Sequence, residues 1–432
     1  MGNPVDGHSV RRQDARPCPS QPPAPTATPL TSADTGEPWC PSCEWGIDEP
    51  TDHSVTGVGW IDRLLYRAAF RLNRAQLTEF FGRPIGRPVL GLAGVFLIAV
   101  SLLLLAGMLG LLALAGWLVV AHPSWVTVPV ALLALGVVWV LLPKFPGLPD
   151  DLELLDRAQA PTLFALIERV AAAAAAPVPD HVAVDTDFNA FARTYGLRRR
   201  RVLCLGLPMW AALPPQQRVA LLGHELGHFV NGDPRTRLLT YPALTTFGNL
   251  AALTRMGPRD VYGFLSMLVD FIARPVMWVI SRSLLLVHIG MSMVGERSSQ
   301  RAEYHADELA VLVAGSSAAR DLTDSLASAA GLDVVVRRAA RNGDEPRDWR
   351  AAADEARVSM RPRMAWFRQL SIRTETSILA SHPPAGMRAR LVESRPWLEP
   401  RVALSEAESD RIDQELAGFY RRKARDIGWV EH

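Results

Sequence analysis

The feature that most constrains this chain is an uncharged apolar run over residues 89–121 of a 432-residue sequence. A helix needs about 20 predominantly apolar residues to cross the hydrocarbon core of a bilayer. A second uncharged run covers residues 125–142, after the break "HPS". The connection between the two runs is too short for anything but a helical hairpin. We therefore predict a transmembrane helical hairpin over residues 89–142, followed by a folded domain.

Basic residues predict how this hairpin is oriented. Several arginines precede the first run and Lys144 follows the second, whereas the hairpin loop carries neither lysine nor arginine. The positive-inside rule then places both ends of the hairpin in the cytoplasm. We expect a multi-pass protein of the cell (inner or plasma) membrane, with its N-terminus and its main domain cytoplasmic. Residues 58–88 mix apolar and basic residues at helical spacing, which predicts an amphipathic juxtamembrane helix along the anionic inner leaflet.

A third apolar region, residues 238–294, is ambiguous. Residues 238–254 are uncharged but only mildly apolar, and residues 261–294 are apolar yet contain Asp270, Arg274, Arg282 and His288. Both segments are long enough to hold a membrane span. They are either two additional membrane helices or amphipathic helices that cover the domain. The sequence therefore leaves two and four membrane spans open.

The N-terminal segment, residues 1–57, is rich in Pro, Ser, Thr and Gly and predicts a disordered tail. Cys40 and Cys43 have C-x-x-C spacing, but a zinc ribbon needs a second such pair, so a reduced, flexible tail is the expected state. The start lacks the basic and apolar regions of a signal peptide. A net charge of +2 gives no argument for nucleic-acid binding. The arginine-rich segment 197–202 is expected to form a solvated turn between strands.

The stretch "LLGHELGHFVNGD", residues 221–233, carries the main chemical signal. His224 and His228 are four residues apart, so on a helix both imidazoles share one face. Glu225 follows His224 and can reach a water molecule held by the pair. Two imidazoles and a carboxylate suit a catalytic zinc, and H-E-x-x-H on a helix is a metalloprotease signature. The alternative is a buried helix with two hydrogen-bonded histidines.

Two histidines do not complete a zinc site, so a third ligand must lie elsewhere. The extended pattern H-E-x-x-H-x-x-G-x-x-H is excluded, because residue 231 is asparagine and residue 234 is proline. The segment "AEYHAD" offers Glu303 and Asp307, which are four apart and share a helix face. We predict Glu303 as the ligand and Asp307 as the group that orients a ligand imidazole. His305 is the rival ligand, and a solvated charged helix start is the non-functional alternative.

Together these segments resemble the HtpX-type membrane zinc metallopeptidases, a broad family that also includes the type I CAAX prenyl proteases. "HELGHFVNGD" and "AEYHAD" are joined by "DFNAFA", residues 187–192, and "SHPPAGMRARL", residues 381–391, in family order. The resemblance implies one Zn²⁺ per chain held by His224, His228 and Glu303, with Glu225 as catalytic base. It implies a protein or peptide substrate, a lipid bilayer as partner, and no nucleic acid.

The expected fold is a helix-rich α+β, gluzincin-like zinc metalloprotease domain with a small β-sheet, over residues 150–400. Residues 181–186 and 201–206 are β-branched runs fit for strands. Residues 161–177 predict a helix, and residues 401–432 predict a charged C-terminal helix.

Two further sets of residues are candidates for binding and catalysis. A substrate strand commonly adds to a sheet edge, and "NAFA" is the candidate edge; an ordinary strand end is the alternative. Its residues are Asn189, Ala190, Phe191 and Ala192. His382 and Arg388 are candidate donors to the oxyanion, unless "HPP" is only a turn that begins a helix.

The predicted activity is a membrane-bound zinc metalloendopeptidase, in quality control of membrane proteins or in precursor processing. The alternatives are a catalytically silent zinc-fold membrane scaffold, a hydrolase of non-peptide substrates, and a CAAX-type prenyl-protein protease. A prenyl protease needs about seven spans for its chamber, and we count at most four.

Overall fold

The computed structural model describes eleven stretches of the chain: 30–31, 38–39, 55–86, 91–142, 147–148, 152–196, 198–231, 234–255, 264–343, 345–380 and 382–429. In a first compact unit, Met1–Glu49, strands β1 (Leu30–Thr31) and β2 (Pro38–Trp39) pair antiparallel. All other elements belong to a second unit, Pro50–His432. The predictions for Cys40 and Cys43 lie outside the described residues.

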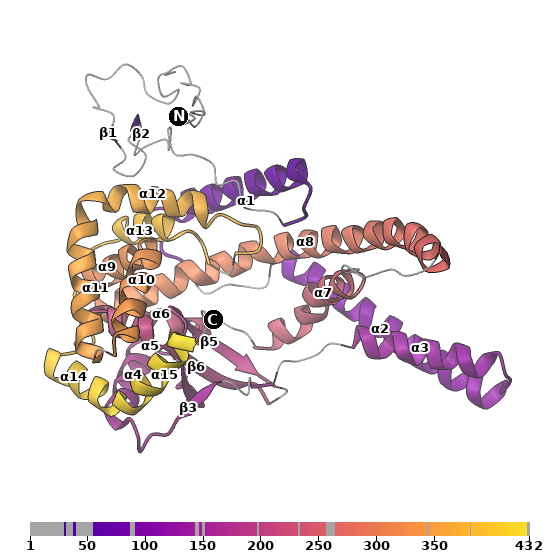
Figure 1. Cartoon of the computed structure of the whole chain (residues 1–432), viewed down its shortest axis with the longest axis horizontal. Helices are drawn as coiled ribbons and strands as arrows, with labels where there is room; N and C mark the ends of the chain where they lie inside the picture. The colour runs from indigo at the N-terminus through magenta and orange to yellow at the C-terminus, as the bar shows by residue number, and fades with distance from the viewer. Residues whose placement is uncertain are drawn as a thin grey trace, which may run out of the picture. The chain divides into compact units, whose positions relative to one another are not determined.

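The second unit is mostly helical (Figure 1). Its helices before and within the apolar regions are α1 (Gly59–Phe80), α2 (Leu92–Ala121), α3 (Thr127–Leu141), α7 (Pro234–Leu253) and α8 (Phe264–Ala314). Its other helices are α4 (Pro161–Ala173), α5 (Leu207–Ala212), α6 (Pro215–Asn231), α9 (Ser316–Ala327), α10 (Ala329–Arg341), α11 (Pro346–Met360), the short 3-10 helix η1 (Arg361–Arg363), α12 (Met364–Thr374), α13 (Ala385–Glu393), α14 (Glu406–Glu415) and α15 (Ala417–Trp429).

A four-stranded mixed sheet has the order β3-β4-β6-β5. Its strands are β3 (Glu153–Leu155), β4 (His181–Asp185), β5 (Ala190–Tyr195) and β6 (Arg200–Gly206). β4 and β6 run parallel, while β3 and β5 pair antiparallel with their neighbours. The edge strand β5 begins with the "AFA" of the candidate substrate segment, and Asn189 directly precedes it. The predicted turn over residues 197–202 is only partly correct: residues 198–199 lie in the turn between β5 and β6, whereas residues 200–202 belong to β6 and Val202 is buried in the core.

The core lies between this sheet and the helices that cover it. Leu163 of α4, Leu203 of β6 and Leu222 of α6 are completely buried in one apolar cluster. Leu416 and Tyr420, from the C-terminal segment, join the same cluster. The predicted charged C-terminal helix is therefore two helices packed into the domain, because apolar residues at helical spacing turn inward and the charged residues turn outward.

Helix α8 is a single helix of 51 residues. The segment that carries Glu303 is therefore not a helix start, which was the non-functional alternative, because α8 runs through it from the apolar segment without a break. One helix thus joins an apolar N-terminal part to the "AEYHAD" segment near its C-terminal end.

Helices α6 and α8 pack closely because α6 presents glycine to α8. A Cβ atom added at Gly227 would lie 3.0 Å from the Cα atom of Ala306 and 3.1 Å from its Cβ atom. A Cβ atom at Gly223 would lie 3.1 Å from the Cα atom of Ala310. These contacts are tighter than ordinary van der Waals packing, so the distance between the two helices depends on glycine at both positions.

We expect Gly227→Ala to separate α6 from α8 and to lower stability by about 1–3 kcal/mol, as overpacking of cores typically does. Thermal unfolding of the detergent-purified protein measures this change. The control is Gly290→Ala in α8, where an added Cβ atom meets nothing within 4 Å. An equal change in Tm for both variants would contradict the close approach.

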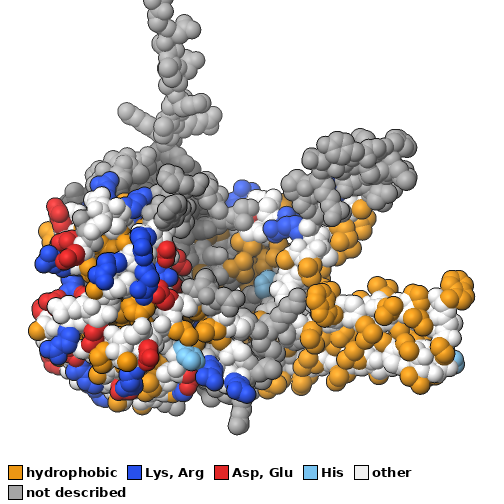
Figure 2. Space-filling model, turned by 60° about the horizontal axis from the view of Figure 1, so that its bottom comes forward, with side chains coloured by type: hydrophobic (Ala, Val, Ile, Leu, Met, Phe, Trp, Pro, Cys, Tyr) orange, Lys and Arg blue, Asp and Glu red, His pale blue; other side chains and the backbone are white. Residues whose placement is uncertain are grey.

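Two described helical segments are long and apolar enough to cross a membrane, judged by length and composition: α2, and residues Ala273–Gly295 of α8. Helix α3 is apolar but shorter, and it packs on α2 through Ala115, Ala131 and Ala134. Figure 2 shows hydrophobic side chains over much of the visible surface of this pair. Such a surface is unfavourable in water, so it favours a lipid environment.

Helix α1 was predicted to lie along the inner leaflet with its apolar face in lipid, but much of that face packs against the rest of the protein. Ala69, Leu77 and Phe80 on one of its faces are buried against the rest of the unit. Leu77 and Phe80 pack with Ile372 and Leu391. The apolar face that was expected to enter lipid is therefore largely used for packing within the protein, which leaves the opposite face exposed.

Candidate metal centre

Helix α6 places His224 and His228 side by side. The two ring centroids are 4.8 Å apart, one helical turn from each other. The helix is buried along most of its length because leucines, valine and alanine occupy the faces that meet the sheet and α8. His224 is buried and His228 is half-buried. The packed helix thus holds both imidazoles on one face, with His224 deeper in the domain than His228.

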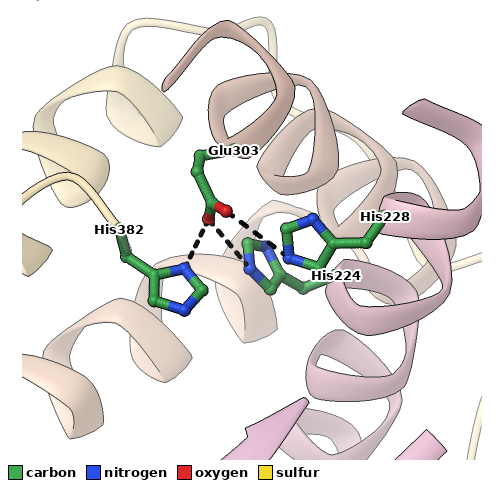
Figure 3. Close-up of side chains that lie close together, drawn as sticks. All are labelled: His224, His228, Glu303 and His382. Carbon is green, nitrogen blue, oxygen red and sulfur yellow. Dashed lines mark hydrogen bonds and ion pairs between the residues drawn. The ribbon is translucent and has the colours of Figure 1, made fainter. Parts of the chain in front are cut away.

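Helix α8 brings Glu303 to this pair (Figure 3). One carboxylate oxygen, Oε2, lies 3.5 Å from Nε2 of His224, and the other, Oε1, lies 3.7 Å from Nε2 of His228. Oε2 is also 2.6 Å from Nδ1 of His382, in the loop before α13. One ligand atom from each of the four residues falls within 4.8 Å of the others. His224 and Glu303 are buried, His228 is half-buried, and the His382 side chain is 39 % exposed.

Asp307 and Arg388 lie behind His224. Oδ1 of Asp307 is 3.0 Å from Nδ1 of His224, and Nη2 of Arg388 donates to Oδ1 at 2.6 Å. Burial alone would raise the pKa of Asp307, but Arg388 and His224 outweigh it and hold that pKa at about 2. The ionised Asp307 accepts a hydrogen bond from Nδ1 of His224. This bond leaves Nε2 of His224 free to bind a metal.

The donor set fits zinc. Ligand atoms about 2.0–2.1 Å from a tetrahedral zinc lie about 3.3–3.4 Å apart. The separations of 3.5 and 3.7 Å between Glu303 and the two histidines are close to that spacing. Two imidazoles and one carboxylate also match catalytic sites that keep the fourth position open. His224, His228 and Glu303 are therefore suited to hold one Zn²⁺ ion.

The comparison with protein families agrees with this geometry. The model of peptidase family M48 matches residues 157–395, which include both metal motifs and the His382 loop. The chain belongs to peptidase family M48. This family contains the HtpX-type proteases and CAAX proteases, so the resemblance seen in the sequence is confirmed. M48 metallopeptidases are in general zinc-dependent. No solved structure matches the chain.

Glu225 is the second residue of the H-E-x-x-H motif, and its side chain is buried beside His224. Burial raises the pKa of the Glu225 carboxyl above its usual value. A carboxylate of raised pKa accepts a proton more readily and releases it later in the same reaction. The environment of this M48 glutamate therefore suits a general base.

The structure places the remaining candidate residues differently. Nδ1 of His305, the rival ligand, lies 2.5 Å from Oδ1 of Asn231, and His305 is outside the group of four. Arg388 binds Asp307 rather than facing the open side of the site. The geometry thus favours a positioning role for Arg388 over the predicted oxyanion donor. The candidate substrate edge, β5, packs against α6.

Sequence reasoning missed Asn231. Its Nδ2 atom donates to the carbonyl oxygen of Ala302 at 2.6 Å, next to Glu303, while Oδ1 contacts His305. These two bonds tie the end of α6 to α8. The sequence showed Asn231 only as the residue that excluded the extended zinc motif. A side-chain amide directly after a metal helix is the signal that could have marked it.

Proposed function

We propose that this M48 metallopeptidase is a membrane-bound, zinc-dependent endopeptidase. The observation that carries the proposal is the buried set of His224, His228 and Glu303, spaced for one zinc ion, with Glu225 adjacent. A silent scaffold does not require a buried general base next to the metal ligands. Among the described residues, no hydrogen bond or ion pair of the buried Glu225 carboxylate accounts for its position in another way.

Each residue then has a defined task. His224, His228 and Glu303 hold the metal, and Asp307 with Arg388 fixes the orientation of His224. A zinc ion held there would supply Lewis acidity, the chemistry that activates water and polarises a carbonyl. Glu225 takes a proton from the attacking water and delivers it to the leaving amine. The half-exposed His382 is suited to donate to the carbonyl oxygen.

The substrate is proposed to bind as an extended strand at the edge of β5, along Asn189, Ala190, Phe191 and Ala192. An edge strand offers unpaired backbone groups on one side, which a peptide can use for hydrogen bonds independent of its side chains. Binding through the backbone suits an endopeptidase with broad specificity. This mode fits removal of damaged membrane proteins or processing of precursors.

The membrane part of the proposal rests on α2 and on Ala273–Gly295 of α8. The α2–α3 pair is proposed to be a transmembrane hairpin, with the peptidase domain and the N-terminus in the cytoplasm. The basic residues before α2 and the absence of lysine and arginine between α2 and α3 support this orientation.

Removal of the metal tests the proposal. We expect the detergent-purified protein to contain about one zinc per chain and to cleave casein. A chelator should abolish cleavage and lower the Tm, because a ligand that binds only the folded state stabilises it. Adding zinc should restore both. Zinc without cleavage of casein would contradict a general endopeptidase, and cleavage of a prenylated peptide alone would assign the prenyl-protease alternative.

A further inference from the structure

Helix α1 lies against the part of α8 that is long and apolar enough to cross a membrane. Ala69 of α1 and Ile289 of α8 belong to one buried cluster, with Leu65 and Leu285 packed against it. Ile289 falls inside the apolar segment Ala273–Gly295. The N-terminal half of α1 is therefore held beside a candidate membrane span. Only eleven residues separate Phe80, the last residue of α1, from Leu92, the first residue of α2.

The outward face of α1 carries a stripe of positive charge, and the exposed Glu79 lies beyond the C-terminal end of that stripe. Its four arginines are exposed and spaced four, four and three residues apart, so they form one stripe along the helix. No ion pair joins any of them to a carboxylate within the described residues. Asp62, on the same helix, instead accepts hydrogen bonds from the backbone and hydroxyl of Thr56. We call this stripe the arginine face: Arg63, Arg67, Arg71 and Arg74.

Exposed apolar side chains lie at the N-terminal end of the arginine face. Trp60 is 64 % exposed and Leu64 is 60 % exposed. Tryptophan prefers the boundary between headgroups and acyl chains, and arginine is attracted by anionic headgroups. A cationic stripe ending in exposed tryptophan and leucine matches the surface of an anionic bilayer better than it matches an acidic protein surface.

The opposite face of α1 supports the loop that brings His382 to the metal site. The hydroxyl of Tyr66 donates to the carbonyl oxygen of Arg373, in the last turn of α12 just before this loop, at 3.2 Å. Ile378, four residues before His382, is buried in the cluster of Ala69 and Ile289. The covered face of α1 thus contacts both the candidate membrane span and the segment that leads to His382.

We propose that the arginine face of α1 binds anionic phospholipid headgroups, and that this contact steadies the loop that carries His382. The inference rests on the proposed function as a membrane-bound peptidase and adds a lipid class and a mode of regulation to it. Bound headgroups hold α1 in place, α1 holds the loop, and the loop holds His382 beside Glu303. Peptidase activity should therefore rise with the anionic lipid content of the membrane.

The lipid contact is tested with the full chain in nanodiscs. An environment-sensitive fluorophore is attached to Leu64→Cys, in a background with Cys18, Cys40 and Cys43 replaced by serine; the remaining Cys204 is buried. Quenching by brominated lipids is compared in phosphatidylcholine alone and in phosphatidylcholine mixed with phosphatidylglycerol. We expect stronger quenching with phosphatidylglycerol and its loss at high salt, because ions screen headgroup charge.

The matched variant replaces the arginine face with glutamine. Each arginine near an anionic surface contributes about fivefold to binding, so the fourfold substitution should abolish the dependence on phosphatidylglycerol. The control variant should keep the dependence on phosphatidylglycerol. It replaces four exposed arginines of the C-terminal segment with glutamine: Arg401, Arg411, Arg421 and Arg425. Peptidase activity measured in the same nanodiscs should rise with phosphatidylglycerol in the control variant and should not depend on it in the variant of the arginine face.

Equal quenching in both lipid mixtures would overturn the proposal. A raised KM for an acidic peptide in detergent, caused by the glutamine variant alone, would instead assign the arginine face to substrate binding. Lipid-dependent quenching with unchanged activity would overturn the link to the His382 loop. Quenching does not require turnover, so the lipid contact would remain measurable even if the protein proved not to be a peptidase.

Discussion

Glu225→Gln is expected to abolish peptide cleavage while leaving the metal content unchanged. Glutamine has nearly the shape of glutamate, so the buried position beside His224 stays filled. An amide cannot accept the proton of the attacking water, and general base catalysis typically contributes about 10²–10⁴-fold. We therefore expect kcat/KM to fall by at least about 10²-fold. Atomic emission measures the zinc content, and an assay of casein cleavage measures the loss of activity.

The matched control for this variant is Glu308→Gln, on the helix that carries Glu303. The Glu308 carboxylate accepts from the backbone of Ile85 and pairs with Arg395, so it does not enter the metal site. This variant should retain both zinc and cleavage. Cleavage that survives in Glu225→Gln would exclude Glu225 as the base, and loss of zinc would show that the side chain has a structural role.

Arg388→Gln is expected to weaken zinc binding and to destabilise the fold. Arg388 and Asp307 form a buried ion pair, and removal of one partner leaves the other charge uncompensated. Such a loss typically costs about 3–5 kcal/mol. Loss of Arg388 should raise the pKa of Asp307 and weaken its hold on His224. Loss of a group that orients a ligand typically lowers metal affinity by about 10–100-fold.

A competition assay with a chromophoric chelator measures the zinc affinity, and thermal unfolding measures the stability. The double variant Arg388→Gln with Asp307→Asn is the informative comparison, because it removes both charges. It should lose less stability than the two single variants added together, as expected for residues in direct contact. Strict additivity of the two losses, or an unchanged zinc affinity in Arg388→Gln, would show that the pair does not act through His224.

Patterns confined to one helix or strand could be read from the sequence. The spacing of His224 and His228 places both on one face of any helix, whatever surrounds it. The helix boundaries near Pro215 and Asn231 follow from proline and glycine signals that act locally. The apolar run of α2 and the strand pattern of β6 are local in the same way. For these elements the backbone geometry of a single segment is sufficient.

Contacts between distant segments were decided only by the tertiary structure. Glu303 reaches the histidines because Gly223 and Gly227 let α6 approach α8, and this fit depends on both helices at once. Arg388 can reach an oxyanion or Asp307 by spacing alone; packing directs it to Asp307. The burial of the C-terminal helices and the choice of which face of α1 is covered likewise depend on partners far along the chain. Local periodicity predicts which face is apolar, but only the packed domain determines what that face meets.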